Sequence, residues 1–110
     1  MLTSPLILLV DDEPQNLKLL SVILADQGFS LAVATSGERG LAQAERRVPD
    51  LILLDALMPG IDGFEVCRRL KANPVTKDVP VLFMTALNEA AERIRGLELG
   101  AVDFLTKPMN

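Results

Sequence analysis

Five short runs with strand character cross this sequence, and segments with helical spacing separate them. The runs are 6–10, 30–34, 51–55, 81–85 and 102–106. Between them, apolar residues recur every three or four positions, which is typical of amphipathic helices. These helical segments are 14–27, 36–47, 63–72 and 88–99. We expect Asp12 or Glu13 to cap the first segment and Gly28 to end it, Ser36 to cap the second, and Asp62 or Gly63 to start the third. Strict alternation of this kind matches right-handed β-α-β crossovers, so it predicts an open, doubly wound α/β fold with five parallel strands.

The composition of the runs indicates where each strand lies in the sheet. Runs 6–10, 51–54 and 81–84 are apolar throughout, whereas 30–34 is mixed. A strand covered on both faces is apolar along its whole length. We therefore expect the first, third and fourth strands in the centre of the sheet and the second nearer an edge, in the order 2-1-3-4-5.

Polar residues follow the strands at the points where they end. Asp11 and Asp12 follow the first strand, Asp55 and Thr85 end the third and fourth, and Lys107 follows the fifth. The carboxyl ends of parallel strands share one edge, and ligands bind there where the strand order reverses. In the order 2-1-3-4-5 the reversal falls between the first and third strands, which carry the three aspartates.

Neighbouring strands lie about 4.8 Å apart, so three carboxylates at the ends of two such strands come close together. They repel one another unless they share a cation or a proton. The chain has no histidine, so a hard divalent cation with oxygen ligands fits best, Mg²⁺ first and Mn²⁺ as a possibility. Lys107 and Thr85 complete a site suited to a phosphoryl group. Asp55 is the best candidate nucleophile and would form an acyl phosphate. The alternatives are a solvated strand-end Asp55 and an ordinary strand residue at Thr85.

Several motifs together resemble the receiver domain of two-component response regulators and hybrid sensor kinases. They are DDEP at 11–14, LDALMPGIDG at 54–63, Thr85-Ala86 and DFLTKP at 103–108. The resemblance implies a flavodoxin-like receiver fold and phosphorelay signalling. Asp55 would accept a phosphoryl group, with Mg²⁺, from a histidine kinase or a histidine phosphotransfer protein. The domain's surface would then switch and control an output domain or a downstream protein.

The resemblance also implies a role for individual residues. Mg²⁺ would be held by Asp12 and Asp55 directly, by Asp11 through water, and by the backbone carbonyl of Leu57. The phosphoryl oxygens would be held by Thr85, the Ala86 amide and Lys107. Phe104 would be the rotating switch aromatic, although a plain core role is the alternative, and Lys107-Pro108 would be a cis peptide.

Two leucines lie where a side chain could control the lifetime of the acyl phosphate. Leu57 is two residues after Asp55, and Leu87 is two residues after Thr85. Hydrolysis needs a water in line with the phosphorus–oxygen bond, and an apolar side chain cannot orient that water. We expect slow self-dephosphorylation, unless both leucines point away into helix contacts.

Composition narrows the partners and the location. The formal net charge is -4 and there is no basic run, so we expect neither direct nucleic-acid binding nor membrane binding. No apolar stretch could span a bilayer and nothing resembles a signal peptide, which favours a cytoplasmic location. The single cysteine, Cys67, lies in a helical apolar pattern and is expected to be buried.

Other functions remain open from the sequence. The main alternative is a receiver-like docking module that works without phosphorylation. A hydrolase with an Asp nucleophile would need an acid at Leu57, and a flavin-binding loop would not carry three acids at 11–13. The chain is expected to promote its own phosphorylation and dephosphorylation without being a turnover enzyme. We expect 1–110 to be one receiver domain cut before its fifth helix, with uncovered apolar surface that favours self-association.

Overall fold

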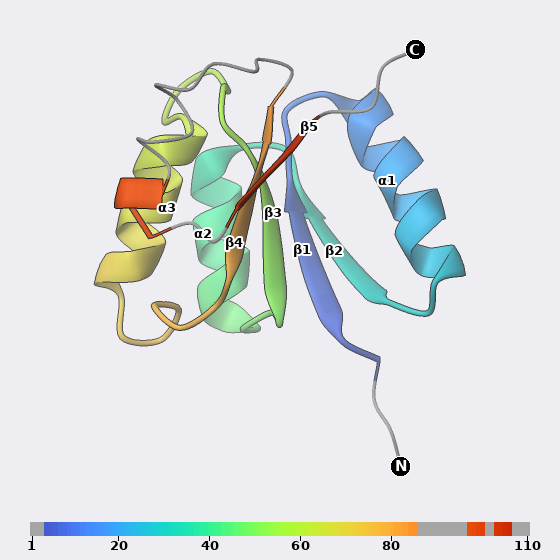
Figure 1. The fold of residues 1–110 in the computed structure, drawn as a ribbon, viewed down its shortest axis with the longest axis horizontal. Helices are drawn as coiled ribbons and strands as arrows, with labels where there is room; N and C mark the ends of the chain where they lie inside the picture. Colours follow the sequence, from blue (N-terminus) through green and yellow to red (C-terminus); the bar gives the residue numbers. More distant parts are fainter. Residues whose placement is uncertain (1–3, 86–96, 101–102, 107–110) are drawn as a thin grey trace.

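The structure is a computed structural model that describes residues 4–85, 97–100 and 103–106, with the backbone alone at 85 and 103–106. Its five strands form one parallel sheet in the order β2-β1-β3-β4-β5, which confirms the predicted fold and strand order (Figure 1). The strands are β1 (Leu6–Val10), β2 (Ser30–Ala34), β3 (Leu51–Asp55), β4 (Val81–Thr85) and β5 (Asp103–Thr106). Within residues 4–85 the helices are α1 (Pro14–Asp26), α2 (Gly37–Arg46) and α3 (Gly63–Ala72).

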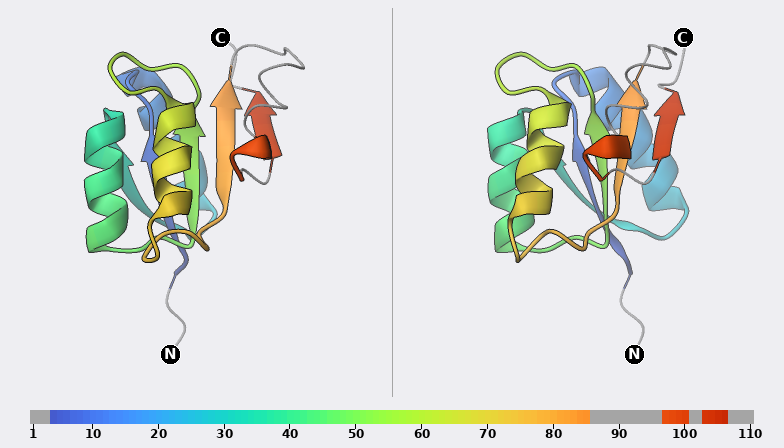
Figure 2. Two further views of the ribbon diagram at one scale, coloured as in Figure 1. Left: turned by 90° about the vertical axis from the view of Figure 1, so that its left-hand side faces the viewer. Right: turned by 60° about the vertical axis from the view of Figure 1, so that its left-hand side comes forward.

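The helices lie on both faces of the sheet. α1 covers one face, while α2 and α3 lie side by side on the other (Figures 1 and 2). β1 and β3 pair in register from Ile7 with Leu51 to Val10 with Leu54. As predicted, β1 and β3 are central and fully apolar in their first four positions, because both of their faces must be covered.

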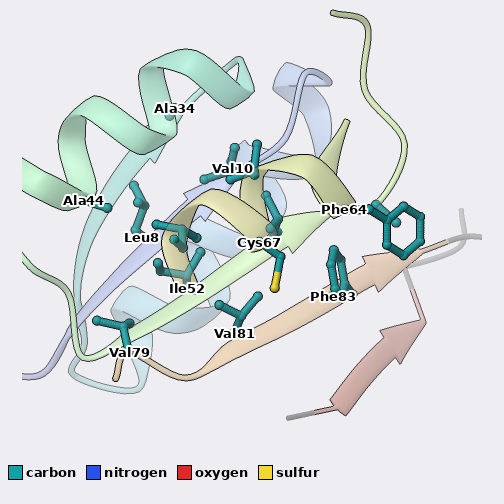
Figure 3. Close-up of a cluster of buried hydrophobic side chains, with 14 of the residues drawn as sticks. Leu8, Val10, Ala34, Ala44, Ile52, Phe64, Cys67, Val79, Val81 and Phe83 are labelled. Carbon is teal, nitrogen blue, oxygen red and sulfur yellow. The ribbon is translucent and has the colours of Figure 1, made fainter. Parts of the chain in front are cut away.

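The larger core cluster lies between the sheet and the α2–α3 layer (Figure 3). Within it, Phe64 in the first turn of α3 packs against Phe83 on β4, with ring centroids 5.0 Å apart and planes inclined by 39°. Offset aromatic pairs of this kind add about 0.5–1.5 kcal/mol beyond their buried area. Cys67 is fully buried in the same cluster, as predicted, and desolvation raises the pKa of its thiol.

Two predicted helix ends are confirmed, the start of α2 and the end of α1. Ser36 caps α2 by accepting a hydrogen bond from the Arg39 amide at 3.2 Å. Gly28 follows α1 with a φ of 91°, the left-handed conformation that glycine adopts without strain. The predicted fourth helix, 88–99, lies outside the described residues except at 97–99. Val102, expected to start the fifth strand, also lies outside them.

The cap of α1 differs from the prediction. Asp12 or Glu13 was expected to cap the helix, and Glu13 does occupy the N-cap position, but its side chain makes no capping bond. Pro14 stands at the first helical position and has no N–H to satisfy. The carboxylate that meets the start of this helix belongs instead to Asp11, as described below.

A surface ion-pair cluster marks the start of α3. Asp62 caps the helix by accepting from the Glu65 amide at 2.9 Å. Arg68 and Arg69 approach the Glu65 carboxylate to 2.6 and 2.7 Å, and their hydrogen bonds lower its pKa to about 2. In the part of the chain that is described, no helix combines the length and apolar character needed to cross a membrane.

Candidate functional site

The three aspartates predicted to share one sheet edge do meet there. One carboxylate oxygen from each of Asp11, Asp12 and Asp55 lies within 4.8 Å of the others. The sheet brings them together because Val10 pairs with Leu54, so the residues that follow leave neighbouring strands side by side. Asp11 and Asp55 are 0% and 1% exposed, whereas Asp12 is half-buried.

Asp11 is held by the first turn of α1. Its Oδ1 accepts a hydrogen bond from the Glu13 amide at 2.9 Å, and its Oδ2 accepts one from Asn16 Nδ2 at 3.3 Å. Its own backbone amide continues the β1–β2 pairing by donating to the Ala34 carbonyl at 3.1 Å. Both the backbone and the carboxylate of Asp11 are therefore fixed in place.

Asp55 is held by the loop that joins β3 to α3. Its Oδ1 accepts a hydrogen bond from the Leu57 amide at 3.1 Å, which orients the carboxylate. The next residue, Ala56, donates to the Met84 carbonyl at 3.1 Å and accepts from the Gly63 amide at 3.0 Å. The end of β3 is thus tied on one side to β4 and on the other to the first residue of α3.

Gly63 approaches the Asp55 backbone more closely than any other residue type could. A Cβ at this position would overlap the Asp55 carbonyl oxygen and lie 2.9 Å from both the Asp55 carbonyl carbon and the Ala56 Cα. The obstacle is backbone, which cannot rotate away as a flexible side chain can. The Gly60 turn nearby has a φ of 78°, and a Cβ there would meet only the Glu38 carboxylate oxygens, at 3.7 and 4.0 Å, which is ordinary contact. Gly60 therefore serves the turn and Gly63 serves the contact.

The donor set suits a hard divalent cation. Carboxylate oxygens are the ligands that Mg²⁺ and Mn²⁺ prefer, and a bond length of about 2.0–2.1 Å limits two direct ligands to a separation of roughly 4.2 Å. Oxygens within 4.8 Å of one another need only a small contraction, or one bridging water, to reach a shared ion. The residues therefore fit the predicted metal without rearrangement of the sheet.

The other predicted site residues are placed less completely. Thr85 lies at the end of β4, where its backbone pairs with Thr106 of β5. The backbone of Phe104 on β5 pairs with Phe83. Thr85 and Phe104 therefore lie on the strands predicted for them. Leu57 is 49% exposed beside Asp55. Three residues assigned to the phosphoryl oxygens or to the acyl phosphate lifetime, with the predicted cis peptide, lie outside the described residues: Ala86, Leu87 and Lys107.

Sequence reasoning missed Asn16 and Gly63. Asn16 stands five residues after Asp11 in a segment recognised only by its apolar spacing, so its amide carried no signal by itself. The sequence marks Gly63 only as the start of a helical pattern. A polar residue in the first helical turn after an acidic strand end is the pattern that could have pointed to Asn16.

Comparison with known proteins identifies the relatives of this chain. A family model described as the response regulator receiver domain matches residues 7–110. The response regulator PleD of Caulobacter vibrioides is 50% identical over 104 residues, which cover 94% of this chain and 23% of PleD. The DNA-binding dual master transcriptional regulator RpaA of Synechocystis is 43% identical over 106 residues, covering 96% of this chain and 44% of RpaA. The chain thus spans less than half the length of these curated relatives.

Solved structures with the same fold include a putative response regulator from Chloroflexus aurantiacus. It superposes with a TM-score of 0.92 at 37% identity, covering 98% of this chain and 88% of that one. The Mn²⁺-bound form of the response regulator Rcp1 superposes with a TM-score of 0.85 at 30% identity, covering 96% of this chain and 83% of that one.

Proposed function

This chain belongs to the family of response regulator receiver domains of two-component systems, and on that premise we propose that Asp55 is its phosphoacceptor. The observation that carries the proposal is the position of Asp55. Its carboxylate is 1% exposed, oriented by the Leu57 amide, and within 4.8 Å of the carboxylates of Asp11 and Asp12. A buried acidic cluster at a strand-order reversal is costly to build for stability alone.

The reaction we propose is transfer from a phosphohistidine. An Asp55 carboxylate oxygen attacks phosphorus, the new phosphorus–oxygen bond forms as the phosphorus–nitrogen bond breaks, and the imidazole nitrogen keeps the electron pair and takes up a proton. The protein's part is to hold the Asp55 carboxylate in line and to keep its rotation fixed. Thr85, the Ala86 amide and Lys107 are proposed to bind the phosphoryl oxygens.

Mg²⁺, or Mn²⁺ in its place, would neutralise charge on the carboxylates and on the incoming phosphoryl oxygens when bound. Asp12, Asp55 and the Leu57 carbonyl are the proposed direct ligands, with Asp11 acting through water. The donor chemistry and the 4.8 Å spacing support a divalent cation, and the Mn²⁺-bound Rcp1 relative supports the same class of ion. The choice of Mg²⁺ stays a prediction.

The signal would reach other proteins through the surface of the domain. We propose that a histidine kinase or a histidine phosphotransfer protein donates the phosphoryl group. The phosphorylated domain would then act on an output domain or a downstream protein, with Phe104 as the switch residue. Three further points stay predictions: the domain works in the cytoplasm, it is not a turnover enzyme by itself, and it does not contact nucleic acid directly. RpaA is a DNA-binding regulator as a whole, which does not assign DNA contact to its matching part.

The test is phosphorylation by a small phosphodonor. Incubation with Mg²⁺ and acetyl phosphate should add one phosphoryl group by intact mass, and hydroxylamine should remove it, as it does from acyl phosphates. Asp55→Asn should block the addition without loss of fold, because the amide is nearly isosteric. Asp26→Asn, at the exposed far end of α1, is the matched control and should be labelled normally.

Two outcomes would count against the proposal. Labelling of Asp55→Asn at wild-type yield would remove Asp55 from the reaction. A complete lack of labelling in the folded wild-type protein would favour the docking module that works without phosphorylation.

A further inference from the structure

α1 starts without the usual side-chain cap. Its N-cap residue, Glu13, makes no capping bond with its side chain, and the first turn contains no acidic residue. The first four N–H groups of a helix have no partner within the helix and carry partial positive charge. An anion placed just before the helix can interact favourably with that end.

Asp11 takes this place, and Asn16 completes the contact. The Glu13 amide bonds to one oxygen of the Asp11 carboxylate and the Asn16 side-chain amide bonds to the other, at 2.9 and 3.3 Å. Asn16 lies in the first turn of α1 and is half-buried, while Asp11 is 0% exposed. The two donors grip the carboxylate at both oxygens, so its plane cannot rotate without breaking one bond.

The chemistry of Asn16 suits a position next to a metal site. Its amide is neutral, so it orients Asp11 without competing with a cation for the charge of the cluster. Each carboxylate oxygen has two acceptor positions, so a bond to Asn16 and an interaction with a cation or its water can coexist on the same group. A leucine here would keep the volume and remove the donor.

We propose that Asn16 is a positioning residue for the metal site, acting through Asp11, and that it couples cation binding to the order of the first turn of α1. This inference rests on the proposed metal site. Asn16 holds Asp11 in the orientation that keeps one of its oxygens within 4.8 Å of oxygens of Asp12 and Asp55, so that little rearrangement is needed when the cation binds. The cation in turn fixes the carboxylate that completes the start of α1, and the turn from Glu13 to Leu17 becomes better ordered.

The first measurement is cation affinity. Mg²⁺ binding is followed by calorimetry, and Mn²⁺ binding by the electron paramagnetic resonance signal of the free ion. Asn16→Leu should weaken binding roughly tenfold, the lower end of the effect seen when groups that orient metal ligands are removed. Gln15→Leu, which changes an exposed amide in the same turn, is the matched control and should bind as the wild type does. Asn16→Ala removes the donor without adding bulk, and serves if the leucine variant does not fold.

The second measurement is amide hydrogen exchange in α1. In the wild type, saturating Mg²⁺ should slow exchange at Glu13 and Leu17; in Asn16→Leu saturated with Mg²⁺, that extra protection should be lost. If Asn16 served stability alone, Asn16→Leu would lower the melting temperature by the same amount with and without Mg²⁺ and would leave the cation affinity unchanged. That result, or tighter binding by Asn16→Leu, would overturn the inference. Failure of the wild-type protein to bind either cation would instead overturn the proposed metal site.

Discussion

Replacing Gly63 with alanine should slow phosphorylation strongly while leaving a folded protein. The added Cβ would overlap the Asp55 carbonyl oxygen and crowd the Asp55 carbonyl carbon and the Ala56 Cα, both at 2.9 Å. Ordinary van der Waals contact between such atoms needs more than 3 Å, so the backbone of Asp55, or the start of α3, must move by about 1 Å. A shift of this size at a reacting group costs about a hundredfold in rate.

The stability cost of the same change should be moderate. Forcing an extra methyl into a packed region costs about 1–3 kcal/mol, and the better helix propensity of alanine returns part of that. Gly60→Ala is the matched control in the same loop. At a φ of 78°, alanine there costs about 1–2 kcal/mol through backbone strain. Its Cβ would meet only the Glu38 carboxylate, at 3.7 Å, so it does not press on Asp55.

The assay compares the two variants for melting temperature by circular dichroism and for phosphorylation rate with acetyl phosphate and Mg²⁺. Similar losses of stability should accompany very different rates, with Gly63→Ala far slower than Gly60→Ala. Phosphorylation of Gly63→Ala at the wild-type rate would refute the reasoning that this contact positions Asp55.

Three further predictions concern the metal, the lifetime and association. Mg²⁺ at a hundredfold excess over its Kd should stabilise the fold by about 2.7 kcal/mol, and Asp12→Ala should reduce this stabilisation more than Thr85→Ala does. Thermal melts with and without Mg²⁺ measure the effect, and an unchanged melting temperature in the wild type would contradict the prediction. Leu57→Asn with Leu87→Glu should shorten the life of the acyl phosphate non-additively, as followed by mass or radiolabel, and equal decay in the wild type would exclude shielding by these leucines. Val22, 64% exposed on α1, should favour self-association, so sedimentation should show Val22→Glu as more monomeric, and a wild-type monomer at high concentration would contradict this.

The sequence predicted the fold well because its strongest signals are local and physical. An apolar run such as Leu6–Val10 must be covered on both faces, and this requirement alone places β1 in the centre of the sheet. Ser36 and Asp62 each stand before a helical pattern, and each does accept a backbone hydrogen bond as a cap. The meeting of Asp11 with Asp55 follows from the strand order, without knowledge of any side-chain orientation.

The contacts that hold the aspartates in place were not predictable in the same way. The bond from Asn16 to Asp11 depends on the path of the chain between β1 and α1, which periodicity does not describe. The expected side-chain cap at Asp12 or Glu13 was wrong. Capping preference depends on residue type and does not say which side chain makes the bond, and here the Asp11 carboxylate already meets that end of the helix. The need for glycine at 63 arises from a distance between two segments, so the residue type alone could not reveal it.

The cluster is anchored to two helices that lie on opposite faces of the sheet (Figure 1). Asp11 is bonded to the first turn of α1, whereas Asp55 is bonded within the loop whose last contact is the first residue of α3. α3 is in turn fixed to β4 by Phe64 and Phe83. A change of charge at Asp55 therefore acts on carboxylates that are tied to both helical layers. Packed elements with close contacts such as that of Gly63 transmit small displacements because they cannot deform continuously, so both faces of the domain should respond to a phosphoryl group at this one edge.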